Sequence, residues 1–274
     1  MDGHVARRGA GDLRQTYVIM KNEVLKFVRG RRMQIYILLL AVVLSLLTAV
    51  PYLFEGHGLS GDPEKVIVSY LSFAPTLVLM AATLFASVSI VSEYEERTAL
   101  LLFTRPVRKR SIFAGKFLAA MGISVLMIGI YYAATALVSL AASGGLDSNM
   151  AVSFGLSVVY AFATSGIAVL ISSLMKKAST STILTFVALL LILPVISQVL
   201  AASGVDTSWM LDRASESICT VLPGYREMMN QLIYSLTGMT VVSEPDAAMD
   251  AAVMAGWGAA TALASFLLFR RREF

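Results

Sequence analysis

Charged side chains are concentrated between Ser92 and Lys116, in a stretch that lies between two long apolar segments. The first half is mainly acidic and the second half is strongly basic, with an apolar patch at 99–103 between them. That patch is too short to cross a bilayer, which needs about 20 apolar residues. Such a stretch is suited to ion pairs and hydrogen bonds with a soluble partner, or to a solvated connector at a membrane surface.

Local sequence signals divide this stretch at its proline. Acidic residues at its start favour a helix N-terminus, where aligned peptide dipoles attract negative charge. Pro106 has no N–H and disfavours helical geometry at Arg105, so one helix is expected to end near Thr104 and another to begin around Pro106. The prediction is a short helix, a turn and a re-entering helix.

The run E-R-T-A-L-L-L-F-T-R-P-V-R-K from Glu96 to Lys109 resembles the cytoplasmic loop between the second and third spans of type-2 ABC transporter permeases. The positions that match the pattern of that family are Thr98, Leu101, Leu102, Pro106, Val107, Gly115 and Lys116. Three positions depart from it, since Arg97 replaces a usual Gly, Ala99 a usual Leu and Arg108 a usual Ser.

In the family that it resembles, this loop is a coupling element that seats in a groove of a separate ATPase subunit. The resemblance implies contacts with that subunit from Glu93, Glu96, Arg97, Thr98, Leu101, Leu102, Arg105, Pro106 and Arg108. The apolar patch would fill the groove and Pro106 would fix the turn. The resemblance also implies two permease subunits and two ATPase subunits, ATP and Mg²⁺ bound by the ATPase, and a role mainly in export.

The composition indicates a membrane protein with several spans. Hydrophobic residues make up 57% of the chain and the mean hydropathy is +0.74. Charged residues make up only 15%, against roughly 25% in ordinary soluble domains. The basic residues lie at the ends of apolar runs instead of forming a separate basic face, so the net charge of +4 does not indicate nucleic-acid binding.

Residues 1–32 form a polar, basic leader that is expected to lie in the cytoplasm. Within it an apolar residue recurs every three or four positions, at Leu13, Tyr17, Met20, Val24 and Val28. This spacing predicts an amphipathic helix along the inner leaflet, the alternative being a solvent-exposed helix. The apolar run that follows starts too late and is too long for a cleaved secretion signal, so we expect it to stay as a membrane anchor.

Residues 33–274 are predicted to form an all-α domain with six transmembrane helices. The expected spans are 33–54, 69–91, 117–142, 151–175, 179–202 and 250–269, each about as long as the hydrocarbon core requires. Residues 92–116 are the coupling loop and residues 203–249 a long outer loop. An even number of spans places both termini on the same side of the membrane.

The distribution of Lys and Arg predicts which side that is. The leader holds eight of them, the loop at 92–116 six, the loop between spans four and five two, and the tail three. Only Lys65, Arg213 and Arg226 of the 22 remain for the other side. The positive-inside rule therefore predicts cytoplasmic termini, in a multi-pass protein of the plasma membrane.

Other signals concern the shape of the spans and the outer loop. Pro75 and Pro194 are expected to kink the second and fifth spans. A short helix at the outer membrane face is expected after Pro223. In the sixth span small residues recur every four positions, at Ala252, Gly256, Ala260 and Ala264, which permits close approach of a helix from this subunit or from a second copy.

Several kinds of chemistry are absent from the sequence. There is no Walker A phosphate-binding motif, so the chain is not expected to bind ATP or to be an enzyme. No predicted span has an ionisable residue near its centre, which argues against ion-coupled transport. The two His residues do not form a metal-ligand set, and Cys219 is interpreted as a small buried residue.

Two alternatives to the transporter function stay open. One is the membrane component of an ATPase-linked maturation or assembly system, which the neighbouring genes would reveal. The other is an ATP-independent structural or receptor-like protein whose loop binds lipid headgroups only. The sequence does not identify a substrate, and it leaves open whether the second permease subunit is a copy of this chain or a related one.

Overall fold

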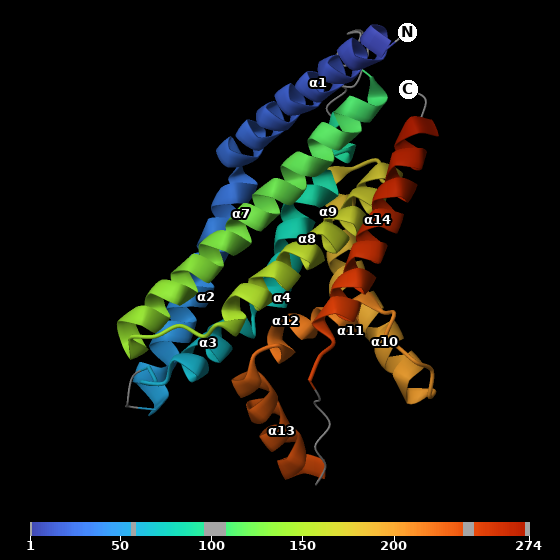
Figure 1. Cartoon of the computed structure of the whole chain (residues 1–274). Coiled ribbons are helices and arrows are strands. Elements are labelled where there is room, and N and C mark those ends of the chain that lie inside the picture. Colours follow the sequence, from blue (N-terminus) through green and yellow to red (C-terminus); the bar gives the residue numbers. More distant parts are fainter. Residues whose placement is uncertain (1, 56–58, 96–107, 238–243, 272–274) are drawn as a thin grey trace.

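The computed structural model describes residues 2–55, 59–95, 108–237 and 244–271, and no strand occurs in these ranges (Figure 1). Six stretches are long and apolar enough to cross a membrane: Arg31–Leu53, Pro63–Glu95, Lys109–Ser143, Asn149–Leu174, Ala178–Ala202 and Ala247–Arg271. Each overlaps one of the segments expected from the sequence. The prediction of an all-α protein with six membrane-spanning helices is therefore confirmed.

Individual helices account for these spans. The first span is α2 (Arg31–Val50) with a π-helical turn, and the third, fourth and sixth are α7 (Lys109–Ser143), α8 (Asn149–Leu174) and α14 (Ala247–Arg271). The second span is built from α3 (Pro63–Leu71), α4 (Ala74–Phe85), a 3₁₀ turn and α5 (Val91–Glu95). The fifth contains α9 (Ala178–Val187), a π-helical turn and α10 (Leu193–Ala202). Before the first span lies α1 (Asp2–Arg29).

The second and fourth spans form the centre of the molecule. In the second span 78% of the apolar window is buried, whereas only 17% is buried in the first and the fifth. The sixth span, α14, packs along α8, and α1 packs along the first half of α7 (Figure 1). The start of α1 and the end of α14 lie at the same end of the molecule, as an even number of spans requires (Figure 1).

Both predicted proline interruptions are present. The second span breaks at Ser72 and Phe73, directly before Pro75, and the fifth span has its π-helical turn at Ala188–Ile192, directly before Pro194. Because Pro75 has no N–H, the carbonyl of Leu71 loses its usual helical donor. The thiol of Cys219 lies 3.6 Å from that carbonyl oxygen and serves as a weak donor in its place.

Close packing of α14 against α8 depends on two glycines. A Cβ atom at Gly166 would overlap the side chain of Thr261, and one at Gly258 would overlap the ring of Phe162. The small residues singled out in the sequence lie on a different face of α14, since Ala252, Gly256 and Ala260 are exposed and Ala264 is half-buried. Contact within the subunit therefore uses another face of this helix.

In its described part, the segment between the fifth and sixth spans forms three short helices, α11 (Leu211–Ser215), α12 (Ser217–Thr220) and α13 (Pro223–Thr237). The short helix expected after Pro223 is therefore confirmed. Helix α12 packs against α8 and α4, where Ser153 donates a hydrogen bond to the carbonyl of Ile218 at 2.6 Å. Helix α13 projects at the end opposite the termini (Figure 1). As expected, Cys219 is buried.

Candidate functional site

The structure describes only the two ends of the predicted coupling loop. Helix α5 carries Glu93, and Arg108 directly precedes α7. The other predicted contact residues lie outside the described residues: Glu96, Arg97, Thr98, Leu101, Leu102, Arg105 and Pro106. The described candidate site is therefore the base of the loop, formed by α5 and the first turns of α7, together with the elements that hold it.

A buried lysine joins the two arms of the loop, which are α5 before it and the first turns of α7 after it. Lys116 on α7 has a side chain only 2% exposed, and its Nζ donates hydrogen bonds to Glu93 Oε1 at 2.8 Å and to Glu23 Oε1 at 2.6 Å. Charge-assisted hydrogen bonds of this kind are about twice as strong as neutral ones. Because Glu93 is on α5 and Glu23 is on α1, this lysine cluster connects three elements that are far apart in the sequence.

Helix α1 lies along the first turns of α7 through a row of contacts on one face. Asp12 accepts a hydrogen bond from the guanidinium of Arg108. Ile19 and Glu23 follow about two and three turns further along α1. Ile19 packs so closely against Gly115 that a Cβ atom on this glycine would lie 2.8 Å from the Ile19 side chain. Gly115 is thus needed for close approach, and Arg108 is engaged within the chain.

The apolar face expected on α1 lies beside this row. Leu13, Tyr17 and Val28 have exposed fractions of 74%, 59% and 48%, while Met20 and Val24 are half-buried against the core. Helix α1 therefore presents one face to α7 and leaves the neighbouring apolar face uncovered in the single chain. Apolar side chains in such a position are typical of a helix that lies on a membrane.

The other arm, α5, is fastened to the connection between the fourth and fifth spans. Glu95 Oε2 accepts a hydrogen bond of 2.8 Å from the N–H of Ala178 at the start of α9. Ser172 Oγ accepts hydrogen bonds from the N–H groups of Ile90 and Val91, at 3.3 and 3.0 Å. A carboxylate at a helix N-terminus is favourable because it satisfies a free N–H and interacts with the helix dipole.

Glu95 was not among the residues singled out for a role from the sequence. It lies 83 positions from Ala178, and no local pattern connects the two. The nearest signal in the sequence is the basic pair Lys176 and Lys177, which directly precedes Ala178 in the loop between the fourth and fifth spans. Two adjacent cations there indicate that an acidic side chain could lie nearby.

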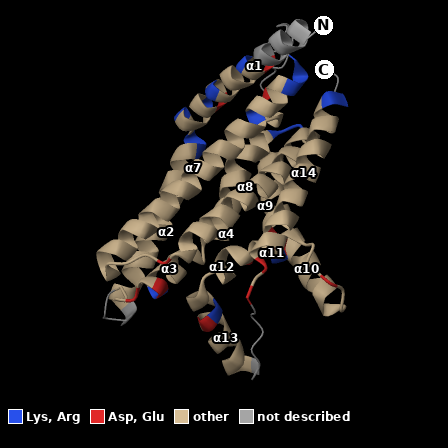
Figure 2. Cartoon of the chain, in the orientation of Figure 1, with Lys and Arg blue, Asp and Glu red and all other residues tan. Residues whose placement is uncertain are grey.

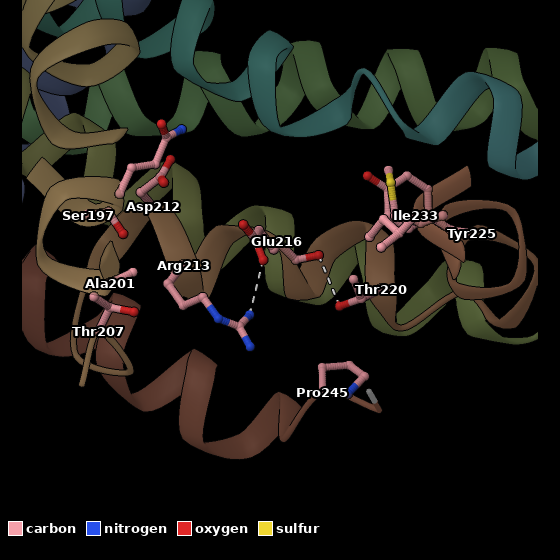
Figure 3. A pocket seen from close by; sticks show the side chains of 12 residues that line it. Ser197, Ala201, Thr207, Asp212, Arg213, Glu216, Thr220, Tyr225, Ile233 and Pro245 are labelled. Carbon is pink, nitrogen blue, oxygen red and sulfur yellow. Dashed lines mark hydrogen bonds and ion pairs between the residues drawn. The ribbon is translucent and has the colours of Figure 1, made fainter. Parts of the chain in front are cut away.

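A second candidate site lies at the opposite end, between α10 and the short helices α11, α12 and α13 (Figure 3). It is a pocket of about 510 Å³ with polar walls and an apolar side formed by residues such as Met229 and Ile233. On its wall Arg213 donates a hydrogen bond of 3.1 Å to Glu216 Oε2, three residues further along the chain. Burial raises the pKa of the Glu216 carboxyl group and that of the Asp212 carboxyl group.

No sequence pattern predicted this pocket. Its signal was the set of charges at Asp212, Arg213 and Glu216, which stand out in an otherwise apolar protein but lie in the part of the outer loop before Pro223, for which no helix was predicted. In the part of the chain that the structure describes, no group of three or more His, Cys, Asp or Glu side chains is arranged to hold a metal ion.

Comparison with known proteins agrees with this architecture. Residues 17–274 match the model of the ABC-2 family transporter protein family. The chain is also similar to the uncharacterized membrane protein YdbK of Bacillus subtilis (strain 168), with 27% identity over 142 residues. That match covers 48% of this chain and 58% of the relative's length. Since the family match extends over nearly all of the sequence, the chain belongs to the ABC-2 family of transporter proteins as a multi-span membrane permease.

Proposed function

We propose that this chain is the membrane-spanning subunit of an ATP-driven exporter and that residues 92–116 couple it to a separate ATPase subunit. The observation that carries the proposal is the lysine cluster at the base of the loop. Lys116 links the arm before the loop, the arm after it and α1, so a force applied to the loop would act on all three together. A loop that only covered the membrane surface would not need such an anchor.

The loop is also held at a second place. Glu95 ties α5 to the start of the fifth span, and Ser172 ties it to the end of the fourth. A movement of the loop would therefore reach the second, third, fourth and fifth spans through direct contacts. This is the mechanical requirement for an element that transmits ATP-driven closure of a motor to a bundle of helices.

The proposed division of labour leaves the chemistry to the partner. The ATPase subunit binds ATP and Mg²⁺ and hydrolyses the nucleotide, while this chain binds neither and forms the path. The complete transporter contains a second permease, either a copy of this chain or a related one, and two ATPase subunits. The termini and the loop face the cytoplasm, across the plasma membrane from the pocket between α10 and α13.

A pull-down in mild detergent tests the coupling. We expect an ATPase with a Walker A motif to copurify with the wild-type chain, and the Glu96→Ala, Arg105→Ala double variant to retain much less of it. The matched control is Lys65→Ala with Glu227→Ala, which also removes one acid and one base but from exposed positions at the opposite end. Its association with the ATPase should equal that of the wild type.

Two outcomes would reject the proposal. If no ATPase copurifies under conditions that preserve other membrane complexes, the ATP-independent structural or receptor-like function becomes the better explanation. If the ATPase copurifies equally with both double variants, the loop is not the contact. If the ATP hydrolysis rate of the copurified ATPase responds to a protein undergoing maturation, and not to an exported compound, the complex is a maturation or assembly system.

A further inference from the structure

Basic side chains from two distant helices line a shallow pocket at the end of the molecule that holds both termini. The pocket has a volume of about 350 Å³ and lies between the start of α7 and the end of α14. It is lined by Arg108, Lys109, Arg110, Phe266 and Arg270. Figure 2 shows Lys and Arg gathered at this end of the chain. The pocket brings cations together although they are far apart in the sequence.

Two of the cations in this pocket, Arg110 and Arg270, are not balanced by the walls that the structure describes. No described acidic side chain lines it, and Arg108 reaches out of it to Asp12. Arg110 and Arg270 are exposed, and neither forms an ion pair with a described residue. Like charges held close together are unfavourable unless an anion joins them, so the pocket favours a negatively charged ligand.

The apolar side of the pocket indicates what kind of anion this is. Phe266 lies one turn before Arg270 on α14. Leu263 and Leu267, seven and three positions before Arg270, share its face of the helix and have exposed fractions of 64% and 54%. An anion bound at Arg270 would therefore have an exposed apolar strip directly below it, running toward the middle of the span. A phosphate group attached to acyl chains matches this combination, whereas a soluble anion would use only the basic part.

We propose that the pocket between the start of α7 and the end of α14 binds the phosphate headgroup of an anionic phospholipid. Arg110 and Arg270 contact the phosphate, and an acyl chain lies along Leu263 and Leu267. Arg270 ends an apolar span, so the pocket lies at the depth where lipid headgroups are found. Basic residues at this depth attract the anionic lipids of the cytoplasmic leaflet. The site adjoins the base of the coupling loop but does not depend on an ATPase.

Native mass spectrometry of the purified full-length chain tests this site. The protein in detergent is titrated with dioleoyl phosphatidylglycerol or with dioleoyl phosphatidylcholine, and the bound lipids are counted. We expect the wild type to retain phosphatidylglycerol preferentially. We expect Arg110→Gln with Arg270→Gln to weaken that binding by roughly tenfold or more, since each basic residue near an anionic lipid contributes about 1 kcal/mol.

Lys21→Gln with Arg271→Gln is the matched control, because both residues are exposed at the same end and neither lines the pocket. It should bind phosphatidylglycerol as the wild type does, and Arg110→Lys with Arg270→Lys should keep most of the binding. An equal loss in the control would mean diffuse charge attraction and would overturn the proposal. Displacement of the lipid by millimolar glycerol 3-phosphate would identify a site for soluble phosphates instead.

Discussion

A buried ammonium group between two carboxylates makes Lys116 the residue on which the base of the loop depends. Its side chain is 2% exposed, and those of Glu23 and Glu93 are each 13% exposed. Removing the cation leaves the carboxylates of Glu23 and Glu93 close together without the ammonium group that lies between them. Breaking a buried charge cluster from one side costs more than the cluster itself contributes, because the remaining charges stay poorly solvated.

We therefore predict that Lys116→Met loosens α1. The expected loss is about 3 kcal/mol, the usual cost of removing one partner of a buried ion pair. Hydrogen exchange measured by mass spectrometry should show faster exchange in α1 and at α5, with α8 and α14 unchanged. Lys21→Met is the control, because Lys21 is exposed on the same helix.

A variant in which the whole cluster is uncharged distinguishes the effect of unbalanced charge from the effect of altered packing. Lys116→Met combined with Glu23→Gln and Glu93→Gln removes all three charges and should recover much of the lost protection in α1. Unchanged exchange in the single Lys116→Met variant would show that the cluster does not hold α1, and would remove the main support for the coupling proposal.

At the scale of single elements, hydropathy and proline positions were sufficient to predict the spans and their interruptions. Pro75 and Pro194 each mark a place where helical hydrogen bonding must change, so the break before α4 and the π-helical turn before α10 follow from local chemistry. The short helix α13 likewise starts at Pro223. These features depend on residues that are near one another in the sequence.

Contacts between elements were not predictable in the same way. The leader was expected to be a helix with an apolar face for the membrane, and only part of that face, at Leu13, Tyr17 and Val28, is exposed. The row from Asp12 to Glu23 that binds α7 was not recognised. Its residues are ordinary polar and apolar types, and their partners lie more than 90 positions away. The spacing of residue types along one helix shows which residues share a face, but it does not show which other helix packs against that face.

The link between α5 and α9 gives a prediction at this scale. Glu95→Ala removes the carboxylate that accepts from the Ala178 N–H, so the first turn of α9 should fray. The loss should be about 1 kcal/mol, as for other helix N-caps. Amide exchange at 178–182 should accelerate several-fold, and Glu95→Asp should restore little because its side chain is shorter. Unchanged exchange in Glu95→Ala would mean that this hydrogen bond does not hold the first turn of α9.

At the scale of the whole molecule, orientation is the property on which the proposals about the loop and the lipid pocket both depend. Nineteen of the 22 Lys and Arg residues belong to segments expected on one side, and the start of α1 and the end of α14 lie at a common end (Figure 1). Translocating so many cations would be unfavourable, so we predict that this end faces the cytoplasm. The pocket around Asp212 then faces outward.

Cysteine labelling in intact cells tests this orientation with little background, because the single native cysteine, Cys219, is buried and burial raises the pKa of its thiol to about 12. Asp206→Cys and Arg271→Cys place reactive thiols at exposed positions on opposite ends. A membrane-impermeant maleimide should label the first in intact cells and the second only after permeabilisation. The reverse pattern would place the loop and the basic pocket outside, where no ATPase could reach them, and would reject the coupling mechanism as a whole.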